Sequence, residues 1–189
     1  VGVSRGMLEE SSKRVRGTQA DILIKDGGSA VIGFSTDMKA KYLPFIQQFP
    51  GVEFATGALI QPVGMLDSVT GIDFAAFDKM SGGFRFVSGG PFKGPDDLIV
   101  DEIYARSKNL KAGDKVNNIL NREWRIAGVV ESGKLSRVFV QLDVLKDLMS
   151  KSDKLTAIYV KASDPTKIPD LVAALKERMP ENKVITVEE

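Results

Sequence analysis

The sequence predicts an α+β fold in which both ends of the chain build one layered unit and the middle is an insertion. Each end has the order strand, helix, strand, at residues 20–25, 37–49 and 52–60 and again at residues 155–162, 166–179 and 184–187. The middle has shorter strands separated by turns rich in glycine and proline. Two strand–helix–strand halves that pair into one sheet form a ferredoxin-like βαβ sandwich, so we expect this sandwich with an inserted β-rich subdomain.

The first half of the sandwich is predicted from three segments. Residues 20–25 alternate weakly between apolar and polar side chains and end at glycines, as strands do. Asp37 is a candidate cap for the following helix, but Pro44 requires either a start near Leu43 or two short turns. Residues 52–65 predict a long strand that bends at Gly57 or Pro62.

The middle of the chain changes from irregular to strongly patterned. Glycine and proline dominate residues 71–94, where only residues 72–74 indicate a strand and 75–80 a helical turn. The later elements are a strand at 98–100, a helix capped by Asp101, a hairpin of 116–120 and 124–131, a strand at 137–141 and a short amphipathic helix at 142–149.

The second half of the sandwich contains the clearest helix of the chain. Its apolar stripe is spaced by three, one, three and four residues, at Ile168, Leu171, Val172, Leu175 and Met179. Pro165 precedes this stripe and Pro180 ends it. Strands predicted at residues 155–162 and 184–187 flank the helix.

Composition excludes several classes of protein. Hydrophobic residues make up 43% and charged residues 27% of the 189 residues, as in ordinary globular proteins. The 26 basic and 25 acidic residues give a net charge of +1, so we expect no nucleic-acid partner. The chain contains no cysteine and no histidine, which excludes thiol nucleophiles, catalytic triads with histidine and the usual zinc sites. We therefore expect no enzyme and no cofactor.

The densest acidic cluster consists of Asp96, Asp97, Asp101 and Glu102. Several carboxylates could bind a divalent cation, which would favour a metal-dependent enzyme as one alternative function. Acids are also common in solvated loops and at helix N-termini, where the helix dipole favours them. We favour the second interpretation and predict no metal site.

Two groups of aromatic residues are candidates for contact with a partner. Phe84, Phe86 and Phe92 lie among glycines and either form an exposed apolar tip or pack into the core. The single tryptophan, Trp124, lies beside arginines in a predicted hairpin strand. It is either an interface anchor or, as we favour, a buried residue. A stand-alone lipid- or peptide-binding module that uses the phenylalanine loop is therefore a further alternative.

The patterned middle segment resembles a known family. The residues are LIVDEIYARSKNLKAGDKV followed by WRIAGVVES, that is, a strand, a helix, a Leu-Lys-x-Gly-Asp-x-Val turn and a strand that ends in Gly-Val-Val. These elements are similar to the extracytoplasmic domain of MacB-like, or FtsX-like, ABC-transporter permeases. Phe49-Pro50-Gly51-Val52 resembles that family's Leu-Pro-Gly-Val helix end, with phenylalanine in place of leucine. The resemblance covers roughly residues 15–189.

The resemblance implies an organisation and a set of partners. Residues 1–16 would continue a transmembrane helix as a stalk, residues 17–65 and 153–189 would form a porter-type subdomain, and residues 66–152 would be inserted into it. The domain would lie on the periplasmic or extracellular side of the cell membrane and transmit ATP-driven motion. Its partners would be a cytoplasmic ATPase, a second permease copy, and an adaptor or exported substrate. Since the chain opens at Val1, we expect it to be part of a longer protein.

Overall fold

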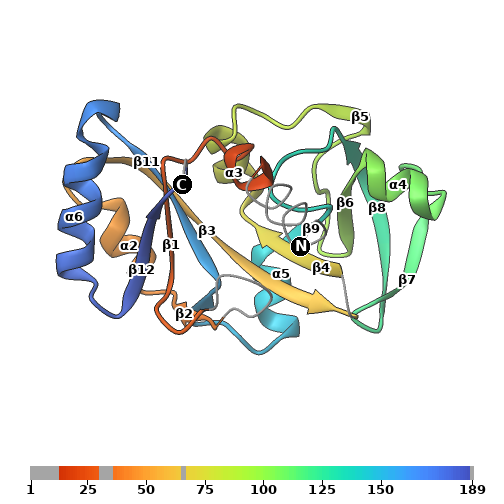
Figure 1. Cartoon of the computed structure of the whole chain (residues 1–189). Helices are drawn as coiled ribbons and strands as arrows, with labels where there is room; N and C mark the ends of the chain where they lie inside the picture. The colour runs from red at the N-terminus through yellow and green to blue at the C-terminus, as the bar shows by residue number, and fades with distance from the viewer. Residues whose placement is uncertain (1–12, 30–35, 65–66, 188–189) are drawn as a thin grey trace, which may run out of the picture.

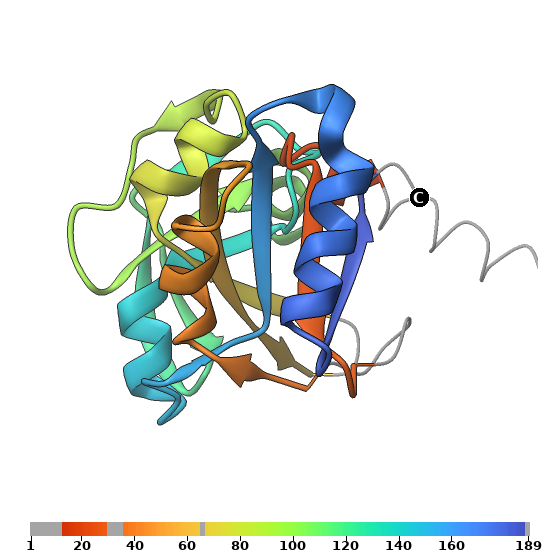
Figure 2. The ribbon, with the colours of Figure 1, turned by 90° about the vertical axis from the view of Figure 1, so that its left-hand side faces the viewer.

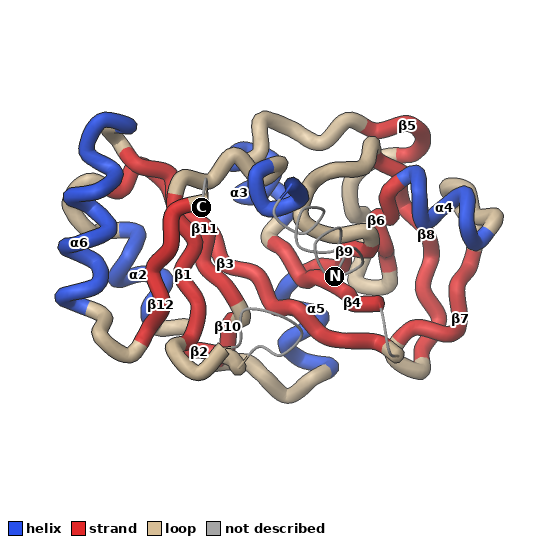
Figure 3. Tube along the Cα trace, in the orientation of Figure 1, coloured by secondary structure: helices blue, strands red, loops and turns tan. Residues whose placement is uncertain are grey.

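A ten-stranded mixed sheet runs through the whole molecule (Figures 1 and 3). The structure is a computed structural model that describes residues 13–29, 36–64 and 67–187. Most of the helix predicted at residues 1–16 lies outside these ranges, and its last residues, 13–16, are helical. The strand order is β12-β1-β11-β3-β4-β9-β6-β8-β5, and β7 pairs with β8.

The two chain ends form the predicted ferredoxin-like sandwich. Its elements are β1 (Ile22–Asp26), α2 (Tyr42–Gln47), β3 (Val52–Val63), β11 (Ala157–Ala162), α6 (Ile168–Arg178) and β12 (Asn182–Thr186). Neighbours in the order β12-β1-β11-β3 are all antiparallel, which is the arrangement of two interleaved βαβ halves. Figure 2 shows α2 and α6 on the same face of these strands. The predicted fold class is thus confirmed.

The chain between β3 and β11 adds strands to the same sheet. Its elements are β4 (Asp67–Ile72), α3 (Phe74–Met80), β5 (Phe86–Gly89), β6 (Asp97–Asp101), α4 (Glu102–Lys108), β7 (Lys115–Ile119), β8 (Arg122–Val130), β9 (Val138–Gln141) and α5 (Leu142–Leu148). The long strand β3 joins the two parts, because Val52–Ala58 pair with β11 and Ala58–Val63 pair with β4. The subdomain boundaries near residues 65 and 152 stay a prediction.

Several details differ from the sequence prediction. The strand predicted at residues 72–74 ends at Ile72, and Phe74 begins α3. Asp37 does not cap a helix: α2 begins at Tyr42, and the Asp37 carboxylate accepts a hydrogen bond of 3.0 Å from the Thr156 hydroxyl. Residues Met38–Lys39 instead form a short strand, β2, which pairs with β10 (Lys154–Leu155). The turn of the β7–β8 hairpin lies one residue earlier than predicted, at Leu120 and Asn121, whose φ angles of 52° and 54° suit a type I′ turn.

Side chains that alternate along the strands build cores on both faces of the sheet. On one face, the sandwich core packs α2 and α6 on Ile24 and Ile158, and the insertion core packs α4 and α5 on Leu98 and Val138. The opposite face carries one aromatic core that draws on both parts of the chain. Its large members are Phe77, Phe84, Phe139 and Tyr159, with Phe74, Phe86 and Phe92 at its margin.

Candidate functional site

The phenylalanines of the glycine-rich segment belong to the aromatic core. Phe84 is buried, and its ring lies 5.5 Å from that of Phe74 and 5.3 Å from that of Phe139. Phe86 and Phe92 are half-buried, with ring centroids 6.2 and 6.0 Å from Phe74. Aromatic pairs at these separations contribute to packing. Phe84 is therefore a packing residue in this structure, and contact of Phe86 or Phe92 with a partner stays a prediction.

Trp124 is an interior residue of the insertion core. Only 1% of its surface is exposed, and its indole nitrogen donates a 2.9 Å hydrogen bond to the Ile119 carbonyl oxygen across the β7–β8 hairpin. The guanidinium of Arg122 lies 4.4 Å from the ring centroid and stacks over it. Trp124 is thus buried with its indole N–H hydrogen-bonded, which fits the buried position that the sequence favoured for it.

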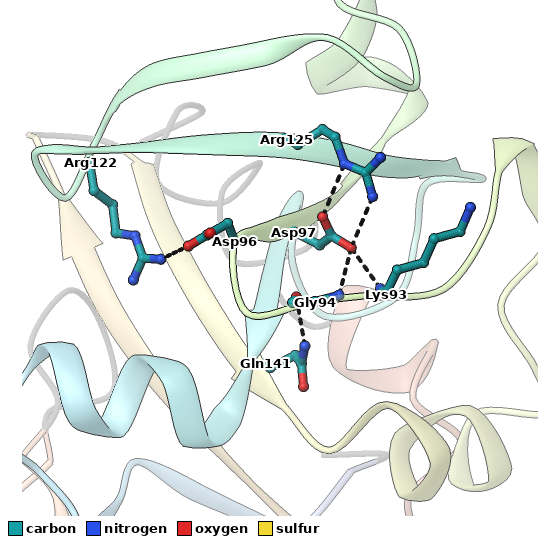
Figure 4. Close-up of polar contacts among 7 residues, drawn as sticks. All are labelled: Lys93, Gly94, Asp96, Asp97, Arg122, Arg125 and Gln141. Carbon is teal, nitrogen blue, oxygen red and sulfur yellow. Dashed lines mark hydrogen bonds and ion pairs between the residues drawn. The ribbon is translucent and has the colours of Figure 1, made fainter.

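Asp97 organises the loop before β6, as Figure 4 shows. Its buried carboxylate accepts hydrogen bonds from the backbone amides of Lys93 (2.6 Å) and Gly94 (3.0 Å), and it pairs with Arg125 at 3.3 Å. Burial would raise the pKa of Asp97, but these amides and Arg125 outweigh it and hold the pKa below its ordinary value. The Gln141 side chain donates to the Gly94 carbonyl oxygen at 2.8 Å, which ties the same loop to α5.

The other acids of the cluster point to different partners. Asp96 pairs with Arg122, and Glu102 lies 3.5 Å from Arg106 one helical turn later. Asp101 caps α4 as predicted, accepting from the Tyr104 amide at 2.7 Å. Burial raises the pKa of Asp101 despite this bond. Within the described ranges, no three acidic side chains converge on a point where a metal ion would be bound. The cluster thus fixes loops and a helix start.

Residues 13–19 contact the β8–β9 loop, which no pattern in the sequence indicates. The Leu135 amide donates to the Arg14 carbonyl oxygen at 2.9 Å, and the Lys134 ammonium donates to the Ser81 carbonyl oxygen at 2.5 Å. A methyl group on Gly17 would overlap the Gly133 carbonyl oxygen, so the two backbones touch. The contacts of Arg14 with Leu135 and of Gly17 with Gly133 join residues more than a hundred positions apart, and no local pattern encodes them. We call residues 13–19 with this loop the N-terminal junction.

Similarity to solved structures shows where this fold has been seen before. The periplasmic region of MacB from Actinobacillus actinomycetemcomitans aligns with a TM-score of 0.66 and 17% identity over 92% of both chains. The extracellular domain of the noncanonic ABC-type transporter YknZ from Gram-positive bacteria aligns with a TM-score of 0.64 and 13% identity, over 88% of this chain and 99% of that one. A domain of a permease protein from Porphyromonas gingivalis aligns with a TM-score of 0.52 and 17% identity over 90% of both chains.

Comparison by sequence gives the family. No curated protein sequence matches the chain significantly. No helix in the described part of the chain is long and apolar enough to cross a membrane. The family profile of the MacB-like periplasmic core domain, in contrast, matches residues 1–178, which is nearly the whole chain. With the shared fold, this match shows that the chain belongs to the MacB-like periplasmic core domains, the extracytoplasmic domains of MacB-type transporter permeases.

Proposed function

We propose that this domain transmits ATP-driven motion from a stalk helix at its N-terminus to surfaces that contact an exported substrate or a partner protein. The motion would originate in a cytoplasmic ATPase subunit or domain of the same transporter. Two permease copies would move against each other on the periplasmic or extracellular side of the cell membrane. The domain itself would carry out no catalysis. The family assignment supports this proposal, and the N-terminal junction is the observation that carries it.

The N-terminal junction connects the end of the first helix to both parts of the sheet. Val15 packs on the aromatic core, which includes strands of the sandwich and of the insertion. The Arg14 carbonyl oxygen accepts from Leu135 of the β8–β9 loop. The Lys161 ammonium of β11 donates to the Gln19 carbonyl oxygen at 3.2 Å. A displacement of this helix would therefore act on β11 and on the β8–β9 loop at the same time.

The glycine at position 17 offers a direct test. A side chain there must push the helix end away from Gly133, because the clash is with backbone and not with a flexible side chain. We would compare Gly17→Val with Gly90→Ala in the full transporter. The control suits the purpose because a methyl group on Gly90 meets nothing within 4 Å. A spin label at Asn117→Cys, an exposed residue of β7, reports the distance between the two copies.

ATP is expected to change the distance between labels in the unaltered transporter and in Gly90→Ala. Gly17→Val should reduce that change in distance while ATP hydrolysis continues. The ATPase would still move the helix, but the contact between the helix end and the β8–β9 loop would be weakened. Lys161→Ala, which removes the bond to Gln19, is a milder second variant if Gly17→Val does not fold. If ATP does not change the distance between the labels in the unaltered transporter, the proposal is contradicted. An ATP response of Gly17→Val equal to that of the control would refute the role of the junction.

A further inference from the structure

The carboxyl ends of two neighbouring parallel strands meet at one edge of the sheet. β4 and β9 run in parallel, with Thr70 opposite Phe139 and Ile72 opposite Gln141. After β4 the chain enters α3, whose buried Phe77 and Met80 pack in the aromatic core on one face. After β9 it enters α5, whose Leu145 packs in the insertion core on the other face. Strands whose following helices leave to opposite faces open a crevice beyond their carboxyl ends.

A pocket of about 420 Å³ occupies this crevice. It is lined by residues 72–75, where β4 leads into α3, by residues 141–143, where β9 leads into α5, and by Pro91 and Phe92 from the loop before β6. The loop is held in place, because the Gln141 side chain donates to the Gly94 carbonyl oxygen at 2.8 Å (Figure 4). The volume of the pocket lies within the range of ordinary small-ligand sites.

The lining combines aromatic walls with negative charge. The rings of Phe74 and Phe92 lie 6.0 Å apart at an angle of 82°, so one ring presents its edge to the face of the other. Among the described residues that line the pocket, the charged ones are Asp73 and Asp143, both exposed, and none is a lysine or arginine. An aromatic wall attracts a cation through the negative face of its ring, and a carboxylate does so through its charge.

The two helix starts reduce this negative charge without cancelling it. The Asp73 carboxylate caps α3 and accepts from the Ala76 amide at 3.2 Å, and Asp143 lies in the first turn of α5. The free amides at a helix N-terminus amount to roughly half a positive charge. Two full negative charges therefore face about one positive charge, so the lining keeps a net negative charge.

We propose that this pocket binds a cation carried on an apolar or aromatic stem. The aromatic walls would hold the stem, and the carboxylates of Asp73 and Asp143 would face the ammonium or guanidinium group. Two sources share this chemistry: a small amphiphilic amine, and a lysine or arginine side chain of a partner protein. The inference does not depend on the mechanical role proposed above, because binding to the 189-residue chain alone tests it.

Binding of matched charged and neutral probes tests the site. For the small-molecule arm the probes are 2-phenylethylamine and its neutral counterpart 2-phenylethanol. For the protein arm they are acetyl-Phe-Arg-amide and the same peptide with citrulline. Saturable shifts of the backbone amide resonances at residues 72–75 and 141–143 are expected with a charged probe. The neutral counterpart should bind about tenfold more weakly, since it lacks the charge term.

Substitutions identify the groups responsible. Asp73→Asn keeps a side chain able to cap α3, so it removes charge without removing the cap. The variant with Asp73→Asn and Asp143→Asn should bind the charged probe about tenfold more weakly. Asp170→Asn, in the first turn of α6 and far from the pocket, should leave binding unchanged. If the double variant does not fold, Asp143→Asn alone gives a smaller loss in the same direction.

The outcomes separate the two sources of the cation. Binding of the amine without the peptide assigns the pocket to small amphiphilic cations, and the reverse assigns it to a basic side chain of a partner. Equal binding of charged and neutral probes would overturn the proposal. The absence of a saturable shift with either charged probe, or an equal loss in Asp170→Asn, would overturn it as well.

Discussion

Removal of the Asp97 carboxylate should destabilise the domain strongly. In Asp97→Ala the amides of Lys93 and Gly94 lose a charged acceptor at 2.6 and 3.0 Å. A hydrogen bond to a charged group contributes about 1.5–3 kcal/mol, and the low end applies because water can reach the loop, so the two bonds give about 3 kcal/mol. The pair with Arg125 adds less than about 1 kcal/mol, since 48% of that side chain is exposed.

Urea unfolding followed by the fluorescence of the single tryptophan, Trp124, measures this cost. Asp96→Ala is the matched control from the same loop. The Asp96 side chain is 63% exposed and pairs with Arg122, so Asp96→Ala should lower the free energy of unfolding by less than about 1 kcal/mol. A cost for Asp97→Ala below about 1 kcal/mol would refute the assignment of Asp97 as the organiser of this loop.

The pH dependence gives an independent check with a definite sign. The folded state holds the pKa of Asp97 below the value of about 3.9 found in unfolded chains, so its stabilisation is present above that pH and is lost as the pH falls through the lower folded value. The difference in the free energy of unfolding between the unaltered chain and Asp97→Asn should therefore become smaller in acid. The contribution of Asp101 to stability changes with pH in the opposite direction. Burial raises the pKa of Asp101, so its contribution to stability declines as the pH rises through the folded value.

Two further substitutions test the insertion core and the sandwich core. Trp124→Phe removes the indole bond to the Ile119 carbonyl oxygen and puts a smaller ring in a buried site, a loss of about 2 kcal/mol that should lower Tm by about 4–8 °C in calorimetry. A shift below about 2 °C would contradict this role of the indole. Leu175→Ala empties a fully buried site under α6 and should cost about 2–5 kcal/mol. Trp124 fluorescence and circular dichroism should then report the same lowered urea midpoint, and separate transitions would contradict a single cooperative unit.

Local patterns in the sequence predicted the elements well where burial leaves a clear apolar pattern. The short apolar runs of β6 and β11 are buried on both faces of the sheet, and the spacing of Leu171 and Leu175 follows from burial of one side of α6. The cap at Asp101 was also predictable, because it needs only the amide of Tyr104, three residues away. These features depend on neighbours along the chain.

Features that depend on distant contacts were missed or left open. The β2–β10 pairing brings Lys39 opposite Lys154, and the bond between Asp37 and Thr156 spans 119 positions, so no local rule gives either. The phenylalanines at 84, 86 and 92 could not be assigned to surface or core, because their burial depends on where α3 packs. The pocket between the starts of α3 and α5 requires β4 and β9 to be neighbours, which only the fold reveals.

The continuity between the two parts of the chain bears on how a force would act on them. β3 is shared by both, and Phe77 contacts the ring of Tyr159 in β11 and that of Phe139 in β9, each at 6.2 Å. Packed cores of this kind transmit displacement with little compression. A push on the N-terminal junction should therefore rotate the sandwich and the insertion together, as one body. Relative motion in the transporter would then occur between permease copies and not between subdomains.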